Sequence, residues 1–245
     1  MPRQARQRSD SGYLHLIVRG IGKQFLFEER EDYTFFLSAL RRYCGETGVR
    51  VLAYCLMENH VHLLVRDSEG CTPQLMKKIG VTYAQHFNRK YERSGHLFQD
   101  RYRSEAVEDE SYLLAVFRYI LNNPQKAGLG PTADYEWSSY AQYGDAGAFV
   151  DTTLLQDLIG DWEQYTAFLA AGKADDCMEY EAPRRDDAWA KAVIRDCLDG
   201  GSGMVLQSCD KAKRDAVLRQ LKQKELSVRQ LERLTGINRG VIQKA

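Results

Sequence analysis

Residues 50–65 read RVLAYCLMENHVHLLV, and this stretch decides the fold. Two runs rich in apolar residues, Arg50 to Met57 and Val61 to Val65, flank the turn-like pair Glu58-Asn59. Such runs on either side of a short polar turn are typical of a β-hairpin. The stretch therefore predicts two neighbouring antiparallel strands.

Further elements are expected on both sides of this hairpin. They are a strand at Gly12 to Gly20, a helix at Glu29 to Cys44, a helix from about Pro73 to Tyr91, an extended segment near Arg103 to Val107, and a helix from Glu110 to about Asn122 that Pro124 stops. The order strand, helix, hairpin, helix, strand predicts an α+β fold: a ferredoxin-like antiparallel sheet with helices on one face. The last helix is an addition to that core.

The length of 245 residues fits one large domain, or a catalytic domain with a small accessory one. We expect a catalytic domain over residues 1–171, a linker and helical connection over 172–208, and a helix-turn-helix-like region over 209–245. The linker assignment depends on a charged segment that contains Pro183 and on the glycine-rich break at 200–203.

The formal net charge is zero, but the charges are unevenly distributed. Residues 211–245 hold ten Lys and Arg against three acids, a surplus of seven. Here Ser227 and Gln230 can form a capping box, Gly236 can end that helix, and Asn238 can cap the next. The pattern predicts an all-α helix-turn-helix that binds DNA. A basic helical hairpin used only for packing is the alternative.

Cysteines and hydropathy indicate the compartment. The six cysteines are scattered without a C-x-x-C pair, so they predict free thiols rather than zinc ligands. No run of eighteen apolar residues and no apolar signal stretch occurs. We therefore expect a cytoplasmic, nucleoid-associated protein with no membrane partner.

The second hairpin strand contains His60 and His62. Side chains two residues apart on a strand point to the same face, about 6–7 Å apart at their origins. Two imidazoles on one face can converge on a divalent ion. Alternatively, one or both form hydrogen bonds at the sheet surface.

The helix that begins at Glu110 carries the second group of candidates. With 100° per residue, an apolar stripe surrounds Phe117, whereas Tyr119 and Asn123 lie on nearly the opposite side, one turn and about 6 Å apart. Tyr112 shares that side but lies about 16 Å from Asn123 along the axis. Tyr119 is therefore the better candidate for a shared site.

Two histidines and the Asn123 amide oxygen suit Mg²⁺ or Mn²⁺ if water and phosphate oxygens complete the coordination. Such an ion would act as a Lewis acid on a phosphoryl group, and Tyr119 would be the attacking nucleophile.

Three runs carry a family resemblance: YCLMENHVHLLV (54–65), SGHLFQDRY (94–102) and RYILNNP (118–124). In this order they resemble the tyrosine HUH transposases, and most closely the REP-associated tyrosine transposases. The start Met-Pro-Arg and the segment WSSY (137–140) also resemble that branch. The resemblance covers roughly residues 1–145.

The resemblance implies metal binding by His60 and His62, nucleophilic attack by Tyr119, and a third ligand at Asn123. The third position is often Gln in the insertion-sequence relatives, so Asn123 is one methylene shorter. The implied activity is metal-dependent cleavage and strand transfer of single-stranded DNA through a 5′-phosphotyrosine, at hairpins of palindromic repeats. The implied fold agrees with the ferredoxin-like order.

Single-strand binding uses cations for phosphates and aromatic rings for unstacked bases. The DNA-binding candidates are Arg3, Arg6, Arg8, His96, Arg101, Arg103 and Arg239. Two other functions stay open: a DNA-binding regulator without catalysis, and a related HUH enzyme that nicks replication origins or plasmids. A monomer and a dimer are both compatible with the sequence.

Overall fold

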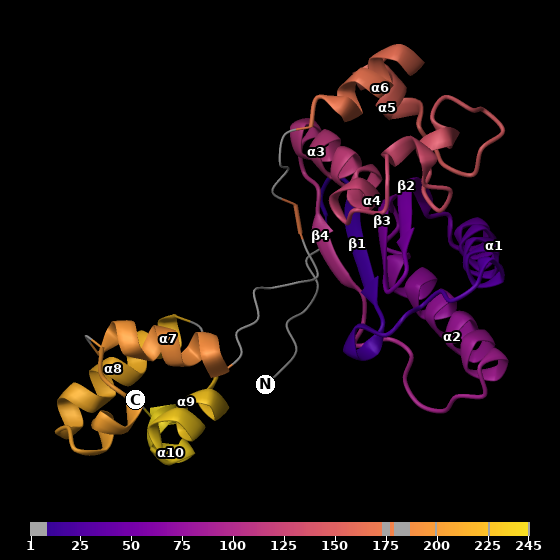
Figure 1. Ribbon diagram of the computed structural model, residues 1–245. Coiled ribbons are helices and arrows are strands. Elements are labelled where there is room, and N and C mark those ends of the chain that lie inside the picture. The colour runs from indigo at the N-terminus through magenta and orange to yellow at the C-terminus, as the bar shows by residue number, and fades with distance from the viewer. Residues whose placement is uncertain (1–8, 173–176, 179–186, 199, 225, 245) are drawn as a thin grey trace. The chain divides into compact units, whose positions relative to one another are not determined.

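The structure is a computed structural model that describes residues 9–172, 177–178, 187–198, 200–224 and 226–244 (Figure 1). The chain divides into two compact units, residues 1–180 and residues 181–245. Among the described residues, no helix combines the length and the apolar character that a membrane span needs.

Unit 1 is built on a four-stranded antiparallel sheet with the strand order β2-β3-β1-β4. The strands are β1 (Tyr13–Arg19), β2 (Arg50–Met57), β3 (His60–Arg66) and β4 (Arg103–Ala106). The predicted hairpin is present, with Glu58 and Asn59 between β2 and β3. The ferredoxin-like order is therefore confirmed.

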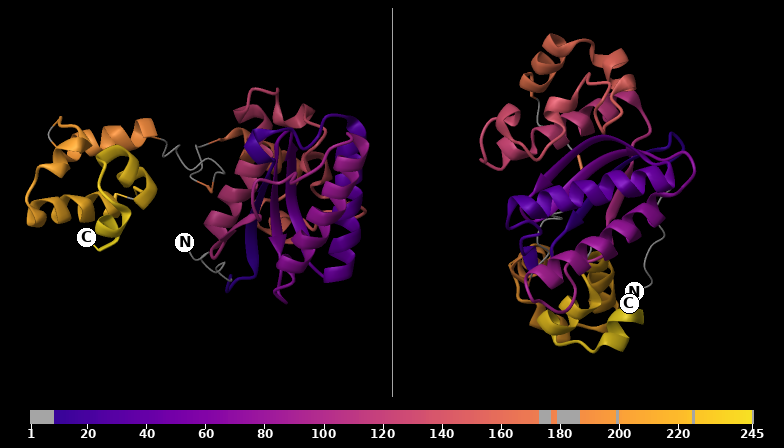
Figure 2. Two further views of the ribbon diagram at one scale, coloured as in Figure 1. Left: turned by 90° about the horizontal axis from the view of Figure 1, so that it is seen from below. Right: turned by 90° about the vertical axis from the view of Figure 1, so that its right-hand side faces the viewer.

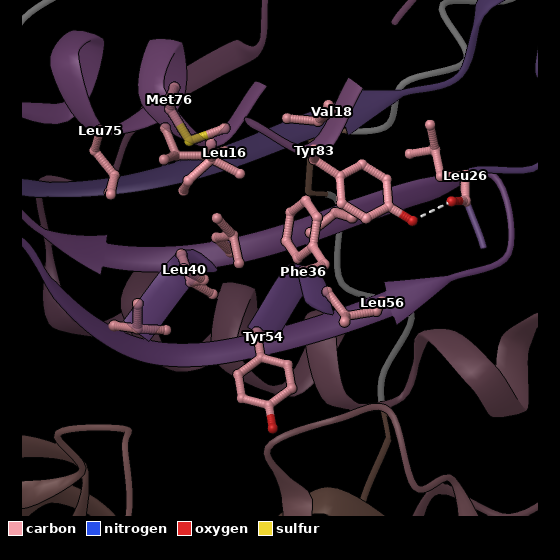
Figure 3. Packing of buried hydrophobic residues seen from close by; sticks show 14 of the residues in the cluster. Leu16, Val18, Leu26, Phe36, Leu40, Tyr54, Leu56, Leu75, Met76 and Tyr83 are labelled. Carbon is pink, nitrogen blue, oxygen red and sulfur yellow. Dashed lines mark hydrogen bonds between the residues drawn. The ribbon is translucent and has the colours of Figure 1, made fainter. Parts of the chain in front are cut away.

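One face of the sheet is covered by α1 (Arg30–Thr47) and α2 (Thr72–Lys90) (Figure 1). Because alternate strand residues share a face, Leu16 and Val18 of β1 meet Phe36 of α1 and Tyr83 of α2 in this layer (Figure 3). The Tyr83 hydroxyl donates a hydrogen bond to the Leu26 carbonyl, which satisfies its polar atom inside the core.

The other face is covered by α3 (Glu110–Leu121), which contacts β2 and β3 on one side and α6 on the other. The layer also includes α5 (Thr153–Ile159) and α6 (Trp162–Ala170) (Figure 2). The prediction of helices on one face is therefore incomplete, because the added helix covers the second face. The reason is that α3 buries side chains on both of its sides: Leu113, Val116, Phe117, Tyr119, Ile120 and Leu121.

Short elements complete unit 1: η1 (Ile21–Lys23), α4 (Asn123–Lys126), η2 (Thr132–Asp134) and η3 (Tyr140–Gln142). The segment before η3 runs beside β2. The Leu56 amide donates to the Trp137 carbonyl at 2.9 Å, and the Ser139 amide donates to the Tyr54 carbonyl at 3.0 Å. These bonds satisfy the outer edge of β2, which would otherwise present unpaired backbone groups.

Unit 2 is helical in its described residues. It consists of α7 (Asp187–Cys197), η4 (Gly203–Gln207), α8 (Lys211–Gln223), α9 (Val228–Thr235) and α10 (Arg239–Lys244). The predicted capping box of Ser227 and Gln230 is present, and Gly236 ends α9 with a φ of 69°. Asn238 Oδ1 accepts from the Gly240 amide at 2.8 Å, which caps α10.

The predicted connection over residues 172–208 includes α7 and η4. Both belong to unit 2, because Ala190, Ile194 and Leu206 share a core with α8 to α10. The helical part of that connection is therefore a structural part of the unit. Residues 173–176 and 179–186 of the predicted linker lie outside the described residues.

Candidate active site

β3 carries His60 and His62 on one face of the sheet, as their two-residue spacing predicts. This is the face covered by α3, since Leu64, the next residue in the alternation, belongs to that side of the core. The two imidazole rings lie 5.0 Å apart between centroids and meet edge to face. His62 is 1% exposed, and His60 is half-buried at the start of the strand.

Each imidazole is held through its Nδ1 atom. His60 Nδ1 lies 2.7 Å from Asn59 Oδ1, and His62 Nδ1 lies 3.1 Å from Nε2 of His15. Because an amide oxygen only accepts, His60 carries its proton on Nδ1 and its unprotonated nitrogen is Nε2. Burial, with His15, His60 and Lys126 nearby, lowers the pKa of His62 well below its usual value. His62 is therefore a neutral imidazole at pH 7, the form that binds metals.

Tyr119 lies on α3 with its ring against the histidines. Its centroid is 5.5 Å from that of His62 and 6.0 Å from that of His15. The Lys126 ammonium lies 5.1 Å from the Tyr119 centroid. The helical wheel predicts a polar side of α3 opposite the apolar stripe, and Tyr119 lies on that side. In the structure this side faces the sheet rather than solvent. For this reason Tyr119 is only 8% exposed.

Asn123 begins α4, four residues after Tyr119. As predicted, α3 ends just before Pro124, at Leu121. Pro124 itself lies in the first turn of α4, where a missing N–H is tolerated. Asn123 is 7% exposed, and its Nδ2 lies 3.4 Å from His62 Nε2. The structure thus brings the four predicted site residues together.

This donor set fits a divalent cation that keeps part of its hydration shell. Ligand bonds of about 2.1 Å at right angles place two donor atoms about 3 Å apart, close to the spacing of His62 Nε2 and the Asn123 amide. A half-turn of that amide presents Oδ1 in place of Nδ2. Within the described part of the chain, no three His, Cys, Asp or Glu side chains form a metal-binding group. Two imidazoles and one amide would leave the remaining positions to water and phosphate oxygens.

Tyr112, the rival nucleophile, has a different environment. Its hydroxyl donates to Glu105 Oε2 at 2.6 Å. Burial and the adjacent carboxylate raise the pKa of Tyr112, which disfavours a phenolate. The structure therefore gives Tyr112 an acidic neighbour and Tyr119 a cationic one.

Two residues of the site were missed in the sequence, His15 and Lys126. His15 is fully buried on β1, where the register pairs Ile17 with His62, so His15 is a diagonal neighbour of His62. A lone histidine in an apolar strand was the available signal, but the strand register that brings it to His62 is not visible in the sequence. Lys126 lies on α4, seven residues after Tyr119, and its ammonium reaches the Tyr119 ring from there.

The predicted DNA-binding residues occupy varied positions. Arg101 lines a cavity of about 360 Å³ with Phe98 and Tyr102, and His96 and Arg103 are exposed. The Arg239 guanidinium is paired with Glu232 at 2.6 Å. Arg3, Arg6 and Arg8 lie outside the described residues. DNA contact by these side chains stays a prediction.

Known proteins resemble this chain in sequence and in fold. Residues 9–123 match the family described as "Transposase IS200 like". A structure of a REP-associated tyrosine transposase bound to a REP hairpin has a TM-score of 0.52 and 15% identity, covering 60% of this chain and 87% of that chain. A transposase candidate from Deinococcus radiodurans has a TM-score of 0.34 and 22% identity, covering 49% of this chain and 96% of that chain. No curated protein gives a significant match. The first structural match shows a shared fold.

Proposed function

We propose that the chain, whose residues 9–123 match the IS200-like transposase family, cuts and rejoins single-stranded DNA through Tyr119. One observation carries the proposal: the Tyr119 ring packs on His62, whose Nε2 lies beside Asn123, in a buried layer. Polar groups are costly to bury, so a cluster of them in an otherwise apolar layer indicates a functional site.

His60, His62 and Asn123 would hold Mg²⁺ or Mn²⁺. When bound, the ion would withdraw charge from the phosphoryl oxygens of the DNA. The two histidines suit this role because their Nδ1 atoms are engaged by Asn59 and His15, which directs the Nε2 atoms toward a ligand.

Tyr119 supplies the nucleophile. Its Oη forms a bond to the scissile phosphorus, and the bond from phosphorus to the 3′-oxygen breaks. Tyr119 loses the phenolic proton and the departing 3′-oxygen gains one, which gives a 5′-phosphotyrosine and a 3′-hydroxyl. Because this link keeps the free energy of the phosphodiester, the reverse step rejoins DNA without a nucleotide cofactor. Lys126 would favour the phenolate electrostatically.

The proposed substrate is a hairpin of palindromic repeats in single-stranded DNA. The solved transposase with the shared fold is bound to a REP hairpin. Unit 2 would add affinity for DNA, since residues 211–245 hold ten basic residues against three acidic ones. Because Arg239 is paired with Glu232, contact with a phosphate would require that ion pair to open.

An adduct gel tests this function. The purified chain is incubated with a labelled single-stranded REP hairpin and Mg²⁺, then separated under denaturing conditions. We expect a covalent protein–DNA band for the wild type and none for Tyr119→Phe. Tyr112→Phe is the matched control, since it removes a hydroxyl from the same helix, and it should still form the band.

The same gel separates the two alternatives. A wild-type chain that binds the hairpin but gives no adduct would be a DNA-binding regulator. Equal cleavage of hairpins and of unstructured origin-like strands would favour a replication-type nickase. Cleavage that requires the hairpin supports the transposase.

A further inference from the structure

A line of polar side chains runs from His62 away from the proposed metal site. His62 Nδ1 lies 3.1 Å from His15 Nε2, and His15 Nδ1 lies 3.9 Å from Glu105 Oε2. That same carboxylate oxygen accepts from the Tyr112 hydroxyl at 2.6 Å and from the Met178 amide at 3.3 Å. The β1–β4 register sets Glu105 directly opposite His15, so the backbone itself places the carboxylate.

The contacts in this line favour one arrangement of protons. Glu105 is a carboxylate at neutral pH, since His15 and the Tyr112 hydroxyl lower its pKa. A carboxylate repels a nitrogen lone pair and attracts an N–H, so His15 carries its proton on Nδ1. His15 Nε2 is then the acceptor, and His62 Nδ1 must be the donor. The lone pair of His62 is left on Nε2, next to Asn123.

We propose that His15 is a positioning residue for the metal site, because it fixes His62 in the tautomer whose Nε2 lone pair faces Asn123, with Glu105 setting the direction. This inference rests on the proposed function, in which His62 is a metal ligand. Ligating histidines commonly donate their other N–H to an outer acceptor, and here that acceptor is a second histidine.

A structural role alone does not explain His15. It is fully buried, and its Nδ1 makes no hydrogen bond among the described residues, although a carboxylate lies 3.9 Å away. A polar imidazole therefore lies fully buried beside the apolar side chains of this layer. An apolar residue of similar volume would pack there at lower cost.

The test measures Mn²⁺ binding to the full-length chain without DNA, by titration calorimetry. In His15→Leu the acceptor for His62 is lost, and we expect the Kd for Mn²⁺ to rise about 10- to 100-fold. His15→Gln restores an acceptor at the position of Nε2 and should recover most of the affinity. His86→Leu is the control, since it removes a half-buried histidine that stacks on Phe35 in the α1–α2 layer.

A second measurement does not depend on metal. Nitrogen-15 spectra of the metal-free chain should show His62 with its proton on Nδ1, and His15→Leu should shift it to the Nε2–H form. If His15→Leu does not fold, Glu105→Gln at the half-exposed end of the line should weaken Mn²⁺ binding in the same direction.

The possible outcomes distinguish a failure of the positioning role of His15 from a failure of the proposed function. A wild type that binds Mn²⁺, with unchanged affinity in His15→Leu and Glu105→Gln, overturns the positioning role and leaves the proposed function standing. A wild type that binds no Mn²⁺ overturns the proposed metal site and this inference together. Loss of affinity in His15→Leu with recovery in His15→Gln supports the role.

Discussion

Replacing Asp32 tests the packing that supports the sheet. The Asp32 carboxylate is fully buried in the first turn of α1. It accepts from the backbone amides of Glu28 and Glu29 at 3.0 Å each, from Lys90 Nζ at 2.9 Å and from the Tyr91 hydroxyl at 2.6 Å. It therefore caps α1 and joins that helix to the end of α2.

Asp32→Asn keeps the shape but removes the charge, and the amide nitrogen cannot accept hydrogen bonds. Lys90 keeps Glu29 and Glu31 at 3.0 Å each, so its own charge stays paired. Hydrogen bonds to a charged group are worth about 1.5–3 kcal/mol, and the upper end, about 3 kcal/mol, applies because several donors converge on one buried carboxylate. For a unit of this size about 3 kcal/mol lowers Tm by roughly 6–12 °C. Thermal denaturation followed by circular dichroism at pH 7 measures the shift.

The stabilisation that the Asp32 carboxylate contributes should also depend on pH. Burial raises the pKa of Asp32, but the bonds from Tyr91, the backbone and Lys90 outweigh it, so the pKa is lowered in the folded state. A lowered folded pKa means that the stabilisation is complete above the unfolded value, about 3.9, and is lost as pH falls through the folded value. The Tm gap between wild type and Asp32→Asn should therefore narrow below about pH 4.

Two control measurements accompany this prediction. Glu46→Gln breaks the exposed pair of Glu46 and Lys78, 2.7 Å apart, and should leave Tm unchanged within error. Adduct formation by Asp32→Asn at 25 °C should match the wild type, because the candidate site lies on the other face of the sheet. A Tm shift no larger than that of Glu46→Gln would refute the account of Asp32.

The remaining predictions concern the metal and the second unit. His60→Ala and His62→Ala should each abolish cleavage with Mg²⁺ or Mn²⁺, as should a chelator added to the wild type, and full cleavage in excess chelator would exclude a metal. Asn123→Ala should reduce cleavage less, since water can replace one neutral oxygen ligand, and raising Mn²⁺ in the same gel assay should restore part of the rate. A chain truncated after Tyr180 should still form the adduct but bind the hairpin more weakly as salt rises, because the basic residues of unit 2 are lost. Unchanged affinity after that truncation would assign unit 2 a packing or partner-binding role.

The sheet and the two helices on its first face, α1 and α2, are predictable from local signals. The apolar runs around Glu58-Asn59 specify the hairpin, and the periodicity around Phe36 and Leu40 specifies α1. That His60 and His62 share one face of the sheet also follows from local geometry, because side chains two residues apart on a strand point the same way. In unit 2, Ser227 and Gly236 mark the helix ends because capping depends on adjacent residues.

The rest of the site depends on contacts between distant segments. A helical wheel placed Tyr119 opposite the apolar stripe, but it could not show that this side faces the sheet. His15 meets His62 across 47 positions of sequence, and a shift of one residue in strand register would point it into the other layer. The sequence does not predict that α5 and α6 lie on the second face, because the chain beyond Asp134 has only weak hydrophobic periodicity.

The central claim is that Tyr119 becomes covalently joined to DNA, and peptide mapping tests it most directly. The wild-type adduct is isolated after reaction with a REP hairpin and Mg²⁺, digested with protease and nuclease, and analysed by mass spectrometry. We predict a nucleotide linked through its 5′-phosphate to the peptide that contains Tyr119, and to no other tyrosine. A nucleotide on Tyr112 or on any other residue, or cleaved DNA with no linked peptide, would contradict the account.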